Sequence, residues 1–197
     1  MLIAIEGCVG AGKSTVVEGL ARYRGSATLF EDFELNPFLT RFYEDPAAHA
    51  LETEFAFLLI HYHQLKRRQH DGEKELITDF FIAKDLVYAD LNLNDPRARQ
   101  AFQGVYDLFL MDVVRPDIVV CLSASDELLL ERIRKRNRPF EQQADPGYYI
   151  QLNAAFETFF EDYEGQKLVI NMDESDFVAD HTLYSLLSRR IDAILAG

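Results

Sequence analysis

The segment that most constrains this chain is a glycine-rich motif close to its N-terminus. Residues 7–15 read GCVGAGKST and match the pattern G-x-x-x-x-G-K-[ST], whose fixed positions fall on Gly7, Gly12, Lys13 and Ser14. An apolar run precedes the motif, and apolar residues recur at helical spacing after it. This order of strand, glycine loop and helix is the one that a phosphate-binding loop requires.

The residue types in this loop suit the binding of a nucleoside triphosphate. Glycines let successive backbone N–H groups face the β-phosphate, and the N-terminus of the following helix adds a partial positive charge. We expect Lys13 to reach the β- and γ-phosphates and the Ser14 hydroxyl to bind Mg²⁺. The loop therefore predicts ATP, or another nucleoside triphosphate, and Mg²⁺ as ligands of Gly7, Gly10, Ala11, Gly12, Lys13, Ser14 and Thr15.

The composition limits the other partners. The chain has 20 Lys and Arg against 33 Asp and Glu, and a net charge of −13 disfavours binding to nucleic acid or to an anionic membrane. No run of about 18 apolar residues predicts a membrane span, and no basic segment followed by a long apolar run suggests export. Cys8 and Cys121 lack metal-ligand spacing, so we expect reduced core cysteines and a cytoplasmic protein.

Alternating strand and helix patterns predict the fold class. Apolar runs typical of buried strands occur at 2–5, 27–30, 76–81, 118–122 and 168–170. Helical patterns follow the glycine loop and occur at 36–43, from Pro46 to near Gly72, at 95–114, 126–136 and 149–165, and after 184. With 48% hydrophobic residues, the 197-residue chain is expected to form one α/β domain: a five-stranded parallel sheet with helices on both faces.

The residues after the second and third strands bear on the phosphate acceptor. Ligands bind at the carboxyl edge of an open parallel sheet, and here that edge carries Glu31, Asp32, Glu34 and Asp79. A monophosphate acceptor would need cations, whereas a neutral hydroxyl benefits from a carboxylate base. Since the first arginine after the second strand is Arg41, the sequence favours a hydroxyl acceptor and hence a nucleoside.

Over most of its length the chain resembles the deoxynucleoside kinases. The resemblance covers the glycine loop, FEDFELNPFLTRFYEDP at 30–46, the helix at 53–66, TDFFIAKD at 78–85, ERIRKRNRPFE at 131–141 and VINMDESDF at 169–177. The loop and the arginine segment are its most specific parts. It implies a P-loop nucleoside-kinase fold over 1–197, transfer of the γ-phosphoryl group of ATP to the 5′-hydroxyl of a deoxynucleoside, and a homodimer.

The resemblance also implies roles for individual residues. Glu31 corresponds to the carboxylate that takes the proton from the 5′-hydroxyl, and Tyr43 and Glu141 to the pair that binds the sugar 3′-hydroxyl. Asp79 corresponds to a ligand of Mg²⁺ or of water.

A lid at about 132–146 is implied as well. Its arginines close over the phosphates, where planar guanidinium groups bind phosphate oxygens bidentately. The lid arginines are Arg132, Arg136 and Arg138, and the first two join Lys13 and Glu31 as implied catalytic residues. The segment 173–177 would border the adenine of the donor, mostly through its backbone.

Two departures from the family pattern fall on the helix that begins after Pro46. Glutamine is usual at position 54, where this chain has Glu54, and arginine is common where it has His61. An ionised carboxylate only accepts hydrogen bonds, which favours guanine with its adjacent donors, unless Glu54 pairs internally with His61 or another cation. His61 is expected either to contact Asp85 in a base pocket or to be a hydrogen-bonded core residue.

A third departure concerns catalysis. The acid, arginine and serine triplet of the family reads Asp79, Phe80 and Phe81 in this chain, so an expected cation is missing. Losing such a cation can lower a rate by several powers of ten. Either Lys84, near the start of the next helix, substitutes for it, or turnover is weak, or the acceptor differs.

Two other functions fit parts of the sequence. A nucleoside monophosphate kinase such as thymidylate kinase has a similar loop, sheet and lid, but needs arginines near the acceptor where this chain has Glu31 and Phe80. A nucleotide-binding regulator, or a family member that binds without turnover, is the alternative that Phe80 favours. The aromatic helix faces around Phe102 and Phe156 could form either a dimer interface or the intramolecular core.

Overall fold

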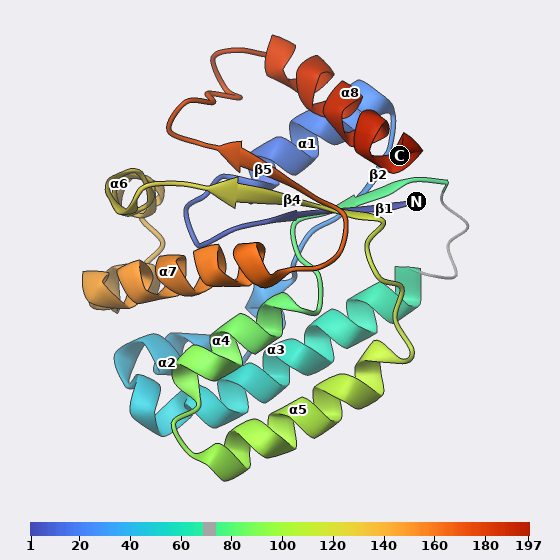
Figure 1. The fold of residues 1–197 in the computed structure, drawn as a ribbon. Coiled ribbons are helices and arrows are strands. Elements are labelled where there is room, and N and C mark those ends of the chain that lie inside the picture. The colour runs from blue at the N-terminus through green and yellow to red at the C-terminus, as the bar shows by residue number, and fades with distance from the viewer. Residues whose placement is uncertain (69–73) are drawn as a thin grey trace.

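A parallel sheet forms the centre of the computed structural model, which describes residues 1–68 and 74–197 (Figure 1). In these residues the sheet has five strands in the order β2-β3-β1-β4-β5, and every neighbouring pair is parallel. The strands are β1 (Leu2–Glu6), β2 (Ala27–Leu29), β3 (Leu76–Thr78), β4 (Ile118–Ser123) and β5 (Lys167–Asn171). All carboxyl ends therefore meet at one edge, which confirms the predicted sheet.

Helices cover both faces of the sheet (Figure 1). On one face lie α1 (Lys13–Arg24) and α8 (Thr182–Ala196); on the other lie α4 (Lys84–Asn92) and α7 (Pro146–Asp162). Outside α4 pack α3 (Pro46–Arg68) and α5 (Pro96–Leu110), with α2 (Leu39–Glu44) against α3 and α6 (Asp126–Arg136) against α7. Short 3₁₀ turns are η1 (Phe33–Leu35) and η2 (Glu141–Gln143). Every helix in the described residues is too short or too polar to cross a lipid bilayer.

The buried side chains form two clusters. One surrounds β1 and β4 between α1, α7 and α8, and it contains both cysteines, Cys8 and Cys121, as free thiols. The other lies among α3, α4 and α5. Phe102 and Phe156 are each 1% exposed, one in each cluster, so their helix faces belong to the intramolecular core.

The buried face of α3 includes polar residues. Leu58 and Leu65 lie on the face that packs against α4, and a helix returns almost to the same direction every seven residues. Glu54 and His61 lie next to that apolar stripe and are 3% and 0% exposed. Helical spacing alone thus carries two ionisable groups into the interior. The predicted end of this helix near Gly72 lies outside the described residues.

The main boundary that differs from the prediction is the end of β3. The strand stops at Thr78 and does not continue to Phe81, because the Thr78 hydroxyl donates to the Phe80 carbonyl (2.9 Å) and turns the chain. The backbone then enters α4 at Lys84. This early turn brings Asp79 and the first turn of α4 to the carboxyl edge of the sheet. Helices α5 and α7 also end a few residues before their predicted ends.

Candidate active site

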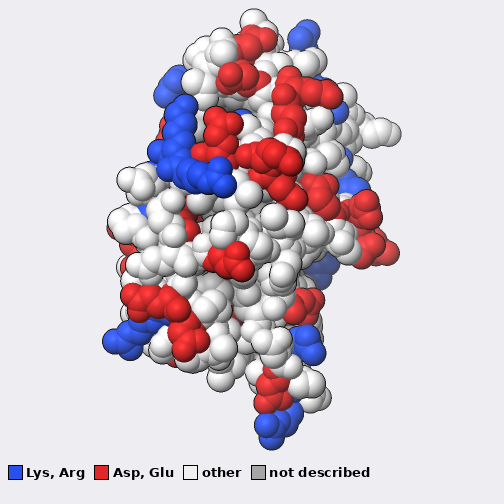
Figure 2. Space-filling view, turned by 90° about the vertical axis from the view of Figure 1, so that its left-hand side faces the viewer, with Lys and Arg blue, Asp and Glu red and all other residues white. Residues whose placement is uncertain are grey.

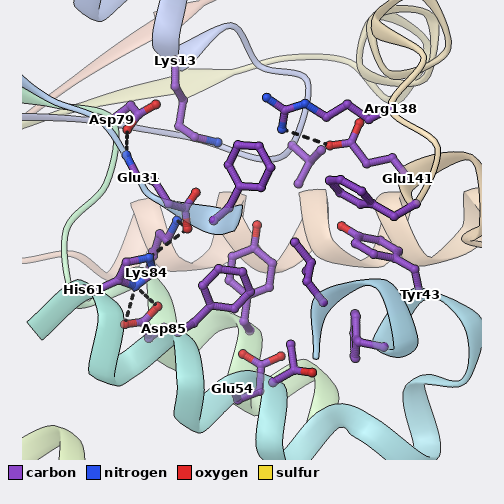
Figure 3. A pocket seen from close by; sticks show the side chains of 18 of the residues that line it. Lys13, Glu31, Tyr43, Glu54, His61, Asp79, Lys84, Asp85, Arg138 and Glu141 are labelled. Atoms are coloured by element: carbon purple, nitrogen blue, oxygen red, sulfur yellow. Dashed lines mark hydrogen bonds and ion pairs between the residues drawn. The ribbon is translucent and has the colours of Figure 1, made fainter. Parts of the chain in front are cut away.

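A cavity of about 300 Å³ opens at the carboxyl edge, between the glycine loop, α2, α3, α4 and the segment after α6 (Figure 3). It gathers most of the residues that the sequence assigned to catalysis and to the acceptor. These are Lys13, Ser14, Glu31, Tyr43, Glu54, His61, Asp79, Asp85, Arg136, Arg138 and Glu141. Phe30, Phe33, Phe57 and Phe140 add aromatic walls. The cavity is therefore polar at particular points and apolar between them, as small-molecule sites usually are.

A second cavity lies on the other side of the glycine loop. It is lined by Gly10, Gly12, Thr15 and Arg132, and by Met172 and residues 176–178 after β5. Lys13, Ser14, Arg136 and Arg138 line both cavities. Two compartments that share one lysine and two arginines suit a donor and an acceptor joined at a phosphoryl group.

The face of the molecule that carries this edge is shown in Figure 2. Acidic side chains are spread over much of it, in keeping with the net charge of −13. Basic side chains gather in its upper left part, at about the height at which α6 lies in Figure 1. Local positive charge is thus present at the site despite the acidic chain.

The glycine loop has the backbone shape that its sequence predicts. Gly10 and Gly12 have φ angles of 87° and 100°, a left-handed region that glycine adopts without strain. A Cβ at Gly7 would lie 2.7 Å from the Leu122 carbonyl oxygen, so the loop packs directly on β4. The loop closes with a hydrogen bond from the Ala11 N–H to the Cys8 carbonyl (3.1 Å).

The Lys13 ammonium folds over this loop. Its Nζ donates to the carbonyl oxygens of Gly7 (2.7 Å) and Cys8 (3.2 Å). The Arg132 guanidinium donates to the Ala11 carbonyl (3.1 Å), which ties α6 to the same loop. Two cations from different elements therefore border the loop.

Ser14 and Asp79 form an oxygen-rich pair beside the loop. The Ser14 hydroxyl donates to Asp79 Oδ2 (2.9 Å), and Asp79 Oδ1 accepts from the Glu31 backbone N–H (2.7 Å). A hydroxyl and a carboxylate suit Mg²⁺, which prefers oxygen ligands and keeps several waters or phosphate oxygens. In the described residues no three His, Cys, Asp or Glu side chains form a metal cluster. The protein would supply only these two groups as ligands, and phosphate oxygens or water molecules would supply the remaining ones.

Three buried ionisable groups, His61, Lys84 and Asp85, meet the partly exposed Glu31 at the other side of the cavity. Glu31 Oε1 accepts from His61 Nε2 (2.8 Å) and from Lys84 Nζ (2.6 Å), and His61 Nδ1 donates to Asp85 (2.8 Å). Figure 3 shows the chain of contacts from Asp85 through His61 to Glu31, with Lys84 beside it. Two carboxylates and two cations give a quartet without net charge.

The quartet fixes the protonation of its members. Burial by itself would raise the pKa of Glu31, but Lys84 and His61 outweigh burial and hold that pKa well below its usual range. Burial likewise opposes the charge on His61, yet Asp85 and Glu31 raise the pKa of the imidazole to about 9. Glu31 is therefore a carboxylate and His61 an imidazolium that donates from both nitrogens at neutral pH.

Phe80 lies beneath this quartet and does not line the cavity. It is fully buried, and its ring centre lies 4.8 Å from that of His61, which stacks on Phe57 on its other side. The Lys84 ammonium lies 5.9 Å from the centre of the Phe80 ring. Where the family pattern has an arginine, this chain thus has a ring that supports His61, and a cation that reaches Glu31 from α4.

Glu54 lies at the inner end of the cavity, away from the glycine loop (Figure 3). Its Oε1 accepts from Asn92 Nδ2 (2.8 Å), and the same amide donates to the Tyr148 hydroxyl (3.2 Å). The expected alternative, an ion pair with His61, does not form, because Asp85 and Glu31 occupy both nitrogens of His61. Burial raises the pKa of Glu54 to about 8.

Glu141 forms ion pairs with two of the arginines that the sequence assigned to a lid. Its carboxylate lies 2.6 Å from Arg136 and 3.5 Å from Arg138, and it is 3% exposed. Tyr43 lines the same cavity and packs on Phe140, with ring centres 5.5 Å apart. The structure thus brings Tyr43 and Glu141 together, and adds an arginine contact to Glu141 that the sequence had not suggested.

Three residues near the site were not found from the sequence. Asn92 follows Asp85 by seven positions on α4, so helical spacing could have placed it on the same face. Nothing in the sequence singles out Tyr148. Glu6, the last residue of β1, is fully buried, and its Oε1 is unpaired among the described residues. An acidic residue at the end of an apolar strand was the sequence feature that could have indicated it.

Known proteins match this chain over nearly its whole length. The family model for deoxynucleoside kinase matches residues 3–196. A deoxyguanosine kinase of Bacillus subtilis (strain 168) is 30% identical over 201 residues, which is 98% of this chain and 97% of that protein. A deoxyadenosine kinase of Lactobacillus acidophilus is 30% identical over 209 residues, 97% of this chain and 94% of that protein.

Solved structures agree with the sequence comparisons. The structure of deoxyadenosine kinase from M. mycoides with the products dCMP and a flexible dCDP bound has a TM-score of 0.85 and 25% identity, over 98% of this chain and 100% of that one. The same enzyme with bound dATP has a TM-score of 0.84 at 25% identity, over 98% and 99% of the two chains. The chain belongs to the deoxynucleoside kinase family, phosphotransferases that act on a nucleoside hydroxyl.

Proposed function

We propose that this protein transfers the γ-phosphoryl group of ATP to the 5′-hydroxyl of a deoxynucleoside, with a purine as the preferred base. The observation that carries the proposal is the Glu31 carboxylate, which lies in the cavity beside the Ser14–Asp79 pair and is kept ionised by two cations. The relatives named as deoxyguanosine and deoxyadenosine kinases support a purine acceptor. An acceptor-side carboxylate suits an uncharged hydroxyl better than a phosphate.

The donor would occupy the compartment around the glycine loop. The backbone N–H groups of the glycine loop and Lys13 bind the β- and γ-phosphates. Arg132, Arg136 and Arg138 cover these phosphates from a lid at about 132–146. Arginine to phosphate contacts require Arg136 and Arg138 to leave Glu141, which lies 2.6 Å and 3.5 Å away. Ser14 and Asp79 would hold Mg²⁺, which would neutralise charge at the phosphates.

The acceptor would lie with its 5′-hydroxyl at Glu31. As the hydroxyl oxygen bonds to the γ-phosphorus, the bond from that phosphorus to the bridging oxygen breaks, ADP leaves and the hydroxyl proton passes to Glu31. A carboxylate with a lowered pKa is a weak base, which is tolerable because phosphoryl transfer depends mainly on positioning and charge. Tyr43 and Glu141 bind the 3′-hydroxyl, and the base lies between Phe57 and the inner wall near Glu54.

The test measures ADP formation by purified protein with ATP, Mg²⁺ and each deoxynucleoside or monophosphate in turn. Glu31→Gln should lower kcat by about 10²–10⁴ because it removes the base while keeping the shape. Glu34→Gln, on the exposed side of the neighbouring 3₁₀ turn, is the matched control and should leave kcat unchanged. Phosphorylation of monophosphates alone, or nucleotide binding without turnover, would contradict the proposal.

We further propose a cytoplasmic homodimer. Two buried free cysteines fit a reducing compartment. Exposed apolar side chains support association: Leu51 and Leu59 on α3 and Leu108 on α5, each between 48% and 57% exposed, with Met111 (78%) just beyond α5. A monomer mass in light scattering at micromolar concentration would contradict the dimer.

A further inference from the structure

The inner end of the cavity presents a carboxyl group in surroundings that oppose its ionisation. Glu54 is 3% exposed, and its hydrogen-bond partner is a neutral amide, Asn92. The side-chain nitrogen of Asn92 donates one hydrogen to Glu54 and the other to the Tyr148 hydroxyl. An unpaired carboxylate in such a place is costly, because burial removes its water without supplying a cation.

The charged groups around Glu54 do not replace that missing cation. From α4, Asp85 disfavours its ionised form and Lys84 favours it, and from α3 His61 also favours it. The two cations are already paired, since both contact Glu31. The remaining titratable groups that face the cavity here are phenols: Tyr148 from α7, Tyr43 from α2 and Tyr88 from α4. No cation of the described residues makes an ion pair with Glu54.

We propose that Glu54 binds the nucleobase as a neutral carboxylic acid, and that loss of its proton shifts the choice of base from adenine towards guanine. This inference rests on the proposed deoxynucleoside kinase activity. It also replaces the expectation from sequence, in which an ionised Glu54 selects guanine at neutral pH. The neutral acid is the form that burial favours, and the uncharged Asn92 amide does not supply the positive charge that would offset burial.

The two forms of the side chain present different hydrogen-bond patterns. A neutral carboxyl group donates from one oxygen and accepts at the other, as a glutamine amide does. That pattern fits the adjacent ring-nitrogen acceptor and amino donor of adenine or cytosine. Asn92 uses one lone pair of Oε1, and the second can accept from the amino group. The ionised form only accepts, which fits the two adjacent donors of guanine.

Both forms are accessible in solution. Burial raises the pKa of Glu54 to about 8, so the acid is mostly neutral at pH 7 and mostly ionised above pH 8. Raising the pH therefore increases the ionised form of Glu54, which suits guanine, and decreases the neutral form, which suits adenine. The ratio of kcat/KM for deoxyadenosine to that for deoxyguanosine should fall by about tenfold or more between about pH 6.5 and 8.5.

The experiment measures this ratio for the wild type and for Glu54→Gln across that range. Glutamine is neutral at every pH, so the variant should keep the low-pH ratio throughout. Glu52→Gln, two residues away on α3 with a side chain that is 35% exposed and pairs with His49, is the control and should follow the wild type. Asn92→Ala removes the hydrogen bond that lowers the pKa of Glu54, and should move the midpoint to higher pH.

The outcomes separate the inference from the activity on which it rests. A wild-type ratio that does not change with pH overturns the inference, even if neither variant folds. An equal change in Glu54→Gln also overturns it, because the titrating group would then lie elsewhere. Failure to phosphorylate any deoxynucleoside contradicts the proposed function itself, and the inference with it.

Discussion

The Lys84 ammonium brings to Glu31 the positive charge that Phe80 cannot provide. Lys84 is 4% exposed, and its Nζ lies 2.6 Å from Glu31 Oε1, at the point where the acceptor hydroxyl would meet the γ-phosphoryl group. Burial opposes the charge on this lysine, but Glu31 and two further carboxylates hold its pKa well above the usual value. It is therefore a buried cation fixed beside the proposed base, and not a surface lysine.

Replacing Lys84 should accordingly impair turnover more than ATP binding. We expect Lys84→Ala to lower kcat by about a hundredfold or more with a small change in KM for ATP, because the cation acts on the transferred group. Lys84→Arg should recover a large part of kcat. Lys66→Ala, at the exposed end of α3, is the control. Steady-state kinetics measure kcat and KM for each variant. An unchanged kcat in Lys84→Ala would mean that another group supplies the positive charge needed for turnover.

Residues differ in how far the sequence could predict them. Gly7, Lys13 and Ser14 could be placed because their spacing within one loop determines their geometry. Glu31 and Asp79 could be placed at one edge, but not the contacts of Glu31 with His61 and Lys84, since those come from α3 and α4 far along the chain. The protonation of Glu54 was unpredictable for the same reason, because it depends on burial that only tertiary packing creates.

At the scale of elements, α1 and α8 pack closely at one glycine. A Cβ at Gly19 would lie 2.0 Å from the Tyr184 ring, which is 6% exposed and is held by Phe177 and by a hydrogen bond to the Thr15 carbonyl. The ring cannot move without losing these contacts. This glycine therefore allows α8 to cover the helix that starts at the glycine loop.

Two alanine substitutions in helices should have opposite effects for this reason. Gly104→Ala, on the exposed side of α5 with no atom within 4 Å of the new Cβ, should raise the free energy of unfolding by about 0.5–1 kcal/mol through helix propensity. Gly19→Ala gains the same propensity, but the clash should lower the free energy of unfolding by about 1–3 kcal/mol. Urea unfolding measures both. Equal signs would contradict the packing argument.

Element boundaries were less predictable than element types. The apolar run at 76–81 predicts a strand throughout, since Phe80, Phe81 and Ile82 are as apolar as the strand itself. A side-chain hydrogen bond from Thr78 ends the strand early, and such local competition with the sheet leaves no trace in hydrophobic periodicity. The three apolar residues still become buried, but in the turn that leads into α4.

At the scale of the whole molecule, several buried groups hold a proton that the unfolded chain would release. Burial raises the pKa of Glu6 to about 8, and the pKa of Glu54 rises to a similar value for the same reason. His61, which burial alone would discharge, keeps its proton to about pH 9 because of Asp85. Each folded-state pKa lies above the unfolded value, so each contribution to stability is lost as the pH rises towards the folded pKa.

The free energy of unfolding should therefore fall between about pH 4.5 and pH 9, by up to about 1.4 kcal/mol per pH unit for each proton difference. Glu6 provides the cleanest test, since it is fully buried at the end of β1 with Oε1 unpaired among the described residues. Glu6→Gln has the shape of the neutral acid but no proton to lose. Its stability should match the wild type near pH 4, below the unfolded pKa of about 4.5, and should exceed it near pH 9.

Thermal or urea unfolding at both pH values measures this difference, and Glu18→Gln, an exposed position on α1, is the control that should keep the wild-type slope. The direction of the change separates two explanations of the buried carboxyl. If Glu6 were ionised in the folded protein and stabilised by Lys84 and Lys13, its removal would destabilise the protein most at high pH. If burial dominates, as the unpaired oxygen indicates, the variant gains relative stability as the pH rises.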